Sequence, residues 1–101
     1  AKKILSNKEF ILWKDYLPGK QKTFLAKQFA GKEAIAKALG TGFQNGIFPK
    51  DIEILRNDEG KPYISAQGSL KNVFTDLEIT SSHVSIADET DYVVAFAIIE
   101  K

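Results

Sequence analysis

The spacing of apolar and polar side chains along the chain predicts three helices. Ser6 and Glu9 stand at the two ends of a Ser-Asn-Lys-Glu capping box, so a helix begins there, and a Leu-Pro-Gly triplet ends it near Tyr16. Residues 23–39 contain no proline and are followed by a glycine typical of a C-cap, so they form the longest predicted helix. Residues 69–77 carry apolar side chains at helical spacing and predict a short third helix.

Four strands are predicted from the remaining apolar runs, at residues 52–55, 62–66, 78–87 and 92–99. An Asn-Asp-Glu-Gly turn joins the first two into a hairpin, and an Asp-Glu-Thr-Asp turn joins the last two. In the third strand, His83, Ser85 and Ala87 alternate with Val84 and Ile86, which places three small or polar side chains on one sheet face.

These elements indicate an α+β fold in which a mainly antiparallel sheet packs against the long central helix. We expect one domain over residues 1–101, because the sequence contains no repeat, linker or low-complexity tract. The composition, 44% hydrophobic and 27% charged, is that of an ordinary globular domain.

The long helix carries charges within and beside its apolar stripe. At ~100° per residue, its apolar side chains fill an arc of about 140°, and Lys32 projects into the same arc. These side chains are Phe24, Leu25, Phe29, Ile35, Ala36 and Leu39. Glu33 and Lys37 lie just beyond the arc, one turn apart. A charge in an apolar stripe needs a partner, because desolvating it unpaired costs several kcal/mol.

Two interpretations of these charges remain open. In the first, Glu33 and Lys37 form an ordinary i,i+4 pair and Lys32 extends along its methylene groups to solvent. In the second, the three residues form a site for a metal–phosphate complex, in which Glu33 holds Mg²⁺ and the lysines neutralise phosphate oxygens.

Composition excludes several classes of site. The chain has no cysteine and one histidine, which excludes a disulfide scaffold, a thiolate zinc site, a cysteine nucleophile and an all-histidine zinc site. Its longest apolar run, residues 92–99, is far shorter than the roughly 20 residues of a membrane helix, so no membrane partner is expected. The first residues lack a signal-peptide pattern, and a cytoplasmic location is therefore expected.

The net charge of +1 conceals an asymmetry between the two parts of the chain. Residues 1–37 hold nine lysines and three acidic residues, while the remainder holds five basic and ten acidic residues. The basic part fits either an acidic partner or phosphorylated ligand, or a solvated surface balanced within the fold. Nucleic acid is not an expected partner, because the only arginine, Arg56, has an acidic neighbourhood.

Residues 29–37, Phe-Ala-Gly-Lys-Glu-Ala-Ile-Ala-Lys, resemble the Phe-x-x-Lys-Glu-Ala-x-x-Lys helix signature of the 4′-phosphopantetheinyl transferases. Four further segments, in the right order and spacing, are similar to the holo-acyl carrier protein synthase branch: residues 24–29, 37–42, 51–54 and 83–95. The resemblance implies this family's fold and Mg²⁺-dependent transfer of 4′-phosphopantetheine from coenzyme A to a serine of an acidic acyl carrier protein. It also implies a homo-oligomer, a trimer in that branch.

The resemblance also implies the site. Glu33 would ligate Mg²⁺, with Glu33 and Lys37 as catalytic residues and Lys32 near the pyrophosphate. The remaining residues expected to contact coenzyme A are Gly40, Thr41, Gly42, His83 and Ser85. The glycine segment is equally compatible with a helix cap and turn. Likewise, His83 is compatible with a hydrogen bond inside the sheet.

Three departures from the family pattern keep other functions open. The family's N-terminal Gly-Ile-Asp strand, whose aspartate is the other principal metal ligand, has no match here, because the chain begins after its place. Gln28 stands where the family often has arginine, and Asp88 where many members have histidine. The alternatives are a truncated homologue that binds coenzyme A or a carrier protein without catalysis, and a structural α+β domain with a fortuitous Lys-Glu-x-x-x-Lys helix.

Overall fold

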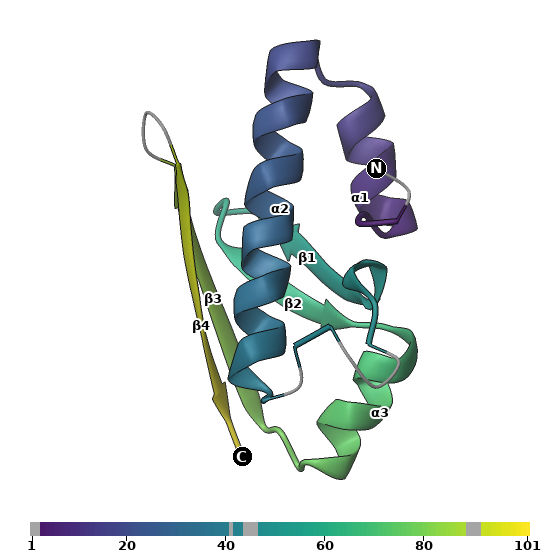
Figure 1. Cartoon of the computed structure of the whole chain (residues 1–101), viewed down its shortest axis with the longest axis vertical. Helices are drawn as coiled ribbons and strands as arrows, with labels where there is room; N and C mark the ends of the chain where they lie inside the picture. The colour runs from purple at the N-terminus through teal and green to yellow at the C-terminus, as the bar shows by residue number, and fades with distance from the viewer. Residues whose placement is uncertain (1–2, 41, 44–46, 89–91) are drawn as a thin grey trace.

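The computed structural model describes residues 3–40, 42–43, 47–88 and 92–101 and has the expected α+β architecture (Figure 1). The elements are α1 (Asn7–Lys14), α2 (Pro18–Ala38), the 3₁₀ turn η1 (Pro49–Asp51), β1 (Ile52–Arg56), β2 (Pro62–Ala66), α3 (Gly68–Asp76), β3 (Ser81–Asp88) and β4 (Val93–Glu100). The long helix α2 contacts both hairpins, while α1 lies alongside it. In the described ranges, no helix has the length and apolar content needed to cross a membrane.

The capping box is confirmed at the start of α1. The Glu9 amide donates to Ser6 Oγ at 3.2 Å, and the Ser6 amide donates to Glu9 Oε1 at 2.8 Å. The predicted start of the long helix at residue 23 was wrong, because α2 already begins at Pro18. Proline is well suited to the first helical position, where its missing N–H has no intrahelical acceptor to lose. Residues 18–22, which lie before the predicted start, therefore belong to α2 as well.

The strands form two separate antiparallel hairpins in the described part of the chain, rather than the single sheet that we predicted. In the first, β1 pairs with β2 so that Ile54 lies opposite Ile64, and in the second, Ser85 of β3 lies opposite Phe96 of β4. β2 and β3 contact each other without forming a ladder. At Ile54, the other edge of β1 is bonded by side chains of α1 and α2.

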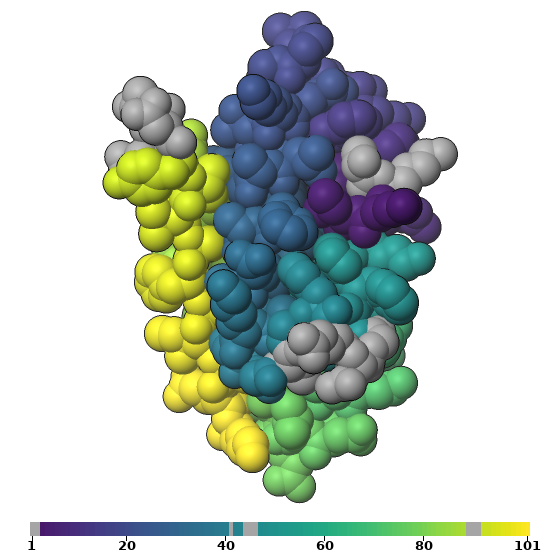
Figure 2. All heavy atoms as spheres, in the orientation of Figure 1, coloured from purple at the N-terminus to yellow at the C-terminus, as the bar shows by residue number. Residues whose placement is uncertain are grey.

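The core lies where α2 meets the two hairpins and α3. Its buried side chains are Ile35, Ala36, Ile47, Ile52, Ile54, Leu70 and Val84. The predicted apolar stripe of α2 is confirmed at Ile35 and Ala36, but Phe29 is 37% exposed and lies at the rim against Phe43. In the space-filling view, β4 forms one side of the molecule beside α2 (Figure 2).

Candidate functional site

Lys32 is buried in the core. The first interpretation of the charges, in which the Lys32 side chain extends to solvent, is therefore wrong for this residue. Its side chain is 0% exposed. The ammonium Nζ donates to Glu9 Oε1 at 2.6 Å and to the Pro49 carbonyl at 2.8 Å. Lys32 therefore joins α2 to α1 and η1, and its charge partner is Glu9 rather than Glu33.

Glu9 is the centre of a buried polar network that the sequence did not reveal as such. Besides Lys32, Glu9 Oε2 accepts from Gln28 Nε2 at 2.7 Å and from the Ile54 amide at 2.8 Å. Gln28 also donates to the Ile54 carbonyl at 3.0 Å, so two side chains bond the free edge of β1 as a strand would. Burial lowers the pKa of Lys32, because desolvation of the ammonium outweighs the opposing attraction of Glu9.

Glu33 and Lys37 lie on the exposed side of α2, in the arrangement that their spacing predicted. Glu33 Oε1 and Lys37 Nζ are 3.8 Å apart, and their side chains are 47% and 72% exposed. An accessible carboxylate suits Mg²⁺, which prefers oxygen ligands, and an ammonium group beside it suits a phosphate oxygen. No group of three or more His, Cys, Asp or Glu in the described part of the chain is placed to hold a metal. Glu33 therefore offers a single carboxylate donor to a metal.

The glycine segment begins directly after this pair. Leu39 is the C-cap of α2, and Gly40 follows it with a φ of +81°, a left-handed conformation that glycine adopts without strain. The Gly40 amide donates to the Lys37 carbonyl at 2.9 Å, and the Gly42 amide donates to the Ala36 carbonyl at 3.1 Å. Thr41 lies outside the described residues. The helix-cap interpretation is thus confirmed, and contact with coenzyme A stays a prediction.

His83 and Ser85 lie on the outer face of the second hairpin. Both are exposed, whereas Val84 between them is 6% exposed and belongs to the core. Ile86, on the same face as Val84, packs against Gly31 of α2. His83 and Ser85 therefore point away from α2, and one chain does not bring them together with Glu33.

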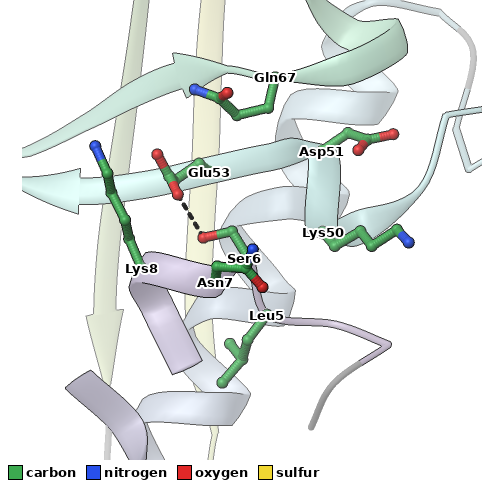
Figure 3. Close-up of a pocket in the computed structure, with 8 residues that line it drawn as sticks. All are labelled: Leu5, Ser6, Asn7, Lys8, Lys50, Asp51, Glu53 and Gln67. Carbon is green, nitrogen blue, oxygen red and sulfur yellow. Dashed lines mark hydrogen bonds between the residues drawn. The ribbon is translucent and has the colours of Figure 1, made fainter. Parts of the chain in front are cut away.

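A polar hollow of about 530 Å³ lies at another place, between α1, η1 and β1 (Figure 3). Its lining residues are Leu5, Ser6, Asn7, Lys8, Lys50, Asp51, Glu53 and Gln67, none of which we predicted as a site residue. Glu53 Oε2 accepts from Ser6 Oγ at 2.6 Å. The alternation of Glu53 with two isoleucines in a strand segment was the only sequence signal that it differs from its neighbours.

The family is decided by a comparison over nearly the whole chain. The family model of the 4′-phosphopantetheinyl transferase superfamily matches residues 1–97. The chain belongs to this superfamily. The resemblance based on the Lys-Glu-Ala helix is therefore confirmed.

Curated relatives indicate which branch of the superfamily the chain resembles. A holo-acyl-carrier-protein synthase of Hydrogenovibrio crunogenus is 43% identical over 100 residues, which cover 99% of this chain and 77% of the relative. A holo-acyl-carrier-protein synthase of Escherichia coli is 39% identical, with 99% of this chain and 78% of the relative covered.

Solved structures of the superfamily confirm the fold. The crystal structure of the Neisseria meningitidis holo-acyl-carrier-protein synthase is 36% identical and matches with a TM-score of 0.92 over 100% of this chain and 79% of its own. The Helicobacter pylori enzyme, solved in complex with coenzyme A, is 27% identical and matches with a TM-score of 0.82 over 98% and 79%.

Proposed function

We propose that the chain is a holo-acyl carrier protein synthase, which transfers 4′-phosphopantetheine from coenzyme A to a serine of acyl carrier protein. The observation that carries the proposal is the accessible Glu33–Lys37 pair on the signature helix, placed one turn before the glycine segment. The relatives named for this activity, at 39% and 43% identity over the chain, support it. So does the fold match to the Helicobacter pylori enzyme, whose structure contains coenzyme A.

The proposed reaction is a phosphoryl transfer. The serine oxygen attacks the phosphorus attached to pantetheine, the bond from that phosphorus to the bridging oxygen breaks, adenosine 3′,5′-bisphosphate leaves, and the hydroxyl proton passes to water. Such a reaction depends on positioning and charge neutralisation more than on covalent help from the protein. Glu33 would hold Mg²⁺, which when bound neutralises pyrophosphate charge. Lys37 would donate to a phosphate oxygen.

The oligomer is part of the same proposal. Beside His83 and Ser85, the outer face of the second hairpin exposes Val94, Phe96 and Ile98, which are 48%, 58% and 50% exposed. An apolar stripe of this kind marks an interaction surface. A homotrimer that covers this stripe would bury it and bring His83 and Ser85 of one subunit toward Glu33 of the next.

The basic part of the chain would receive the acidic carrier. Lys8 and Lys14 lie at the two ends of α1, and between them Ile11 and Leu12 are 56% and 46% exposed. Opposite charges on two partners mainly raise the rate of association. A cytoplasmic location belongs to the same proposal.

One observation favours a second candidate, a homologue that binds coenzyme A or the carrier without catalysis. In the described residues, Glu33 lies in no cluster of acidic side chains that holds a metal without help. A single experiment distinguishes the two functions: the chain is incubated with coenzyme A, Mg²⁺ and an apo acyl carrier protein, and the intact mass of the carrier is measured. A phosphopantetheine-sized gain supports the transferase. Coenzyme A binding without a mass gain supports the second candidate.

A further inference from the structure

Two neighbouring rows of side chains along α2 have opposite environments. Gln28, Lys32 and Ala36 form an i,i+4 row that is buried, with exposures of 4%, 0% and 0%. Glu33 and Lys37 belong to the next row, which faces solvent. Since consecutive residues of an α-helix lie ~100° apart, fixing the buried row fixes the direction of the exposed one.

Lys32, in the middle of the buried row, has partners in two other elements. Its ammonium contacts Glu9, 23 positions earlier, and the Pro49 carbonyl, 17 positions later. Pro49 begins η1, seven positions after Gly42, the last residue of the glycine segment. The upstream end of that segment is tied to the last turn of α2 by the Gly40 amide on the Lys37 carbonyl. Lys32 therefore holds α2, α1 and η1 in one relative position.

Stability alone does not account for a lysine at this position. Replacing a buried ion pair by apolar side chains of similar volume is often neutral or stabilising, because two charges must lose their water. A methionine would fill nearly the same space as Lys32. What the ion pair adds is a directional bond between three elements, which an apolar contact does not supply.

We propose that Lys32, paired with Glu9, is a positioning residue of the transferase site. It fixes the direction in which Glu33 leaves α2, and it does not touch coenzyme A. The inference rests on the proposed function and replaces the expectation that Lys32 lies near the pyrophosphate.

The test uses the double variant Glu9→Gln/Lys32→Met, which removes both buried charges together and leaves neither unpaired. Its unfolding midpoint establishes that it is folded. Four further quantities are then compared with the unchanged chain: the Kd for coenzyme A without metal, the Kd for Mn²⁺ with coenzyme A present, from water-proton relaxation, and kcat and KM for transfer. Lys37→Met is the matched control for an exposed ammonium that we place against phosphate.

We expect the double variant to bind coenzyme A without metal within about twofold of the unchanged chain, because Lys32 has no contact to lose. Its Mn²⁺ affinity and kcat should each fall by roughly 10–100-fold, which is the usual effect of losing a group that orients a metal ligand. Lys37→Met should instead weaken metal-free coenzyme A binding.

Two results would overturn the proposal. Metal-free coenzyme A binding that weakens as much as in Lys37→Met would make Lys32 a phosphate ligand. Unchanged kcat and Mn²⁺ affinity in a folded double variant would make the network structural only. If the double variant does not fold, Glu9→Asp keeps the charge but retracts the carboxylate from Lys32, and unchanged kcat and Mn²⁺ affinity in that folded variant would equally overturn the proposal.

A failure of this proposal can be distinguished from a failure of the proposed function. A chain that binds Mn²⁺ through Glu33 but transfers no phosphopantetheine overturns the transferase function, while its Mn²⁺ affinity still reports the effect of Lys32 on Glu33. A chain whose Mn²⁺ affinity is the same with Glu33→Gln overturns the positioning role, because Glu33 then holds no metal to position.

Discussion

Gly31 of α2 lies directly against Ile86 of β3: a methyl group at Gly31 would stand 2.9 Å from Ile86 Cδ1. The same methyl group would stand 2.8 Å from Ile54 Cδ1 of β1. The lack of a side chain at this one position therefore lets the central helix approach both hairpins at once, and both neighbours meet it with the far ends of flexible side chains.

Substitutions at Gly31 test this close approach of α2 to both hairpins. Gly31→Ala should change the free energy of unfolding by less than about 1 kcal/mol, because the gain in helix propensity offsets the displacement of two methyl groups. Gly31→Leu should lower it by about 1–3 kcal/mol or more through overpacking. Gly19→Ala is the control, because a methyl group there meets nothing within 4 Å. Urea denaturation gives all three values, and a neutral Gly31→Leu would contradict the close approach.

Replacement of Glu33 tests the metal assignment. Glu33→Gln keeps the volume of the side chain but removes the charge, so transfer should fall by about 100-fold or more while the unfolding midpoint stays the same. The carrier's rate of mass gain measures the transfer. Glu59→Gln, which changes an exposed carboxylate in the turn of the first hairpin, should leave the rate unchanged. A Glu33→Gln variant with the original rate shows that Glu33 holds no catalytic metal.

The pair formed by Asp88 and Lys27 predicts a pH effect. Lys27 Nζ lies 3.1 Å from Asp88 Oδ1, and this hydrogen bond and the attraction of the ammonium lower the pKa of Asp88. A lowered pKa means that the ion pair stabilises the fold above the ordinary aspartate pKa, and that this contribution is lost as the pH falls through the lowered value.

Lys27→Met should raise the Asp88 pKa toward its ordinary value, which a carboxyl NMR titration measures. High salt should reduce the difference between the two proteins, since the pair is solvent-exposed. Lys71→Met on α3 serves as the control for loss of a lysine at another place. An identical Asp88 titration with and without Lys27 would contradict the pair.

The sequence was sufficient where the signal is local. The capping box at Ser6 and Glu9 depends on residues three apart, and the alternation around Val84 depends on residues two apart, so both were predicted correctly. Pro18 was misinterpreted, because proline is common both just after a helix and at the first position of one. Local sequence does not decide between those two positions.

The site required tertiary information. The apolar stripe showed that Lys32 needs a partner, but that partner, Glu9, is 23 positions away in another helix. The apolar stripe also predicted that Phe29 lies in the core, but Phe29 is exposed. Phe29 stands at the edge of the helical arc, and a side chain there is buried only if another element covers it. His83 was predicted to contact coenzyme A from the polar strand face that it shares with Ser85, and within one chain that face points away from Glu33.

The apolar face of the second hairpin should control the oligomer. Phe96→Lys places a charge in the exposed stripe, so a trimer formed through this face should dissociate into monomers at micromolar concentration. Light scattering coupled to gel filtration gives the mass. Phe48→Lys, at a residue that is 56% exposed but lies outside the hairpin, should leave the mass unchanged. A monomeric unchanged chain would refute the trimer, and a Phe96→Lys trimer would place its interface on another surface.

The basic surface of α1 should control the rate at which an acidic carrier associates. Lys8 and Lys14 are both exposed, so reversing them together to glutamate changes the charge of the surface by four units without disturbing the core. Association should slow more than dissociation accelerates, and the difference should shrink as salt screens charges beyond about 8 Å. Stopped-flow measurements with apo acyl carrier protein give both rates.

The control reverses Lys71 and Lys101, which changes the net charge equally but leaves α1 intact. Equal slowing in both double variants would show that net charge alone attracts the carrier, and an unchanged association rate would exclude α1 as its docking surface.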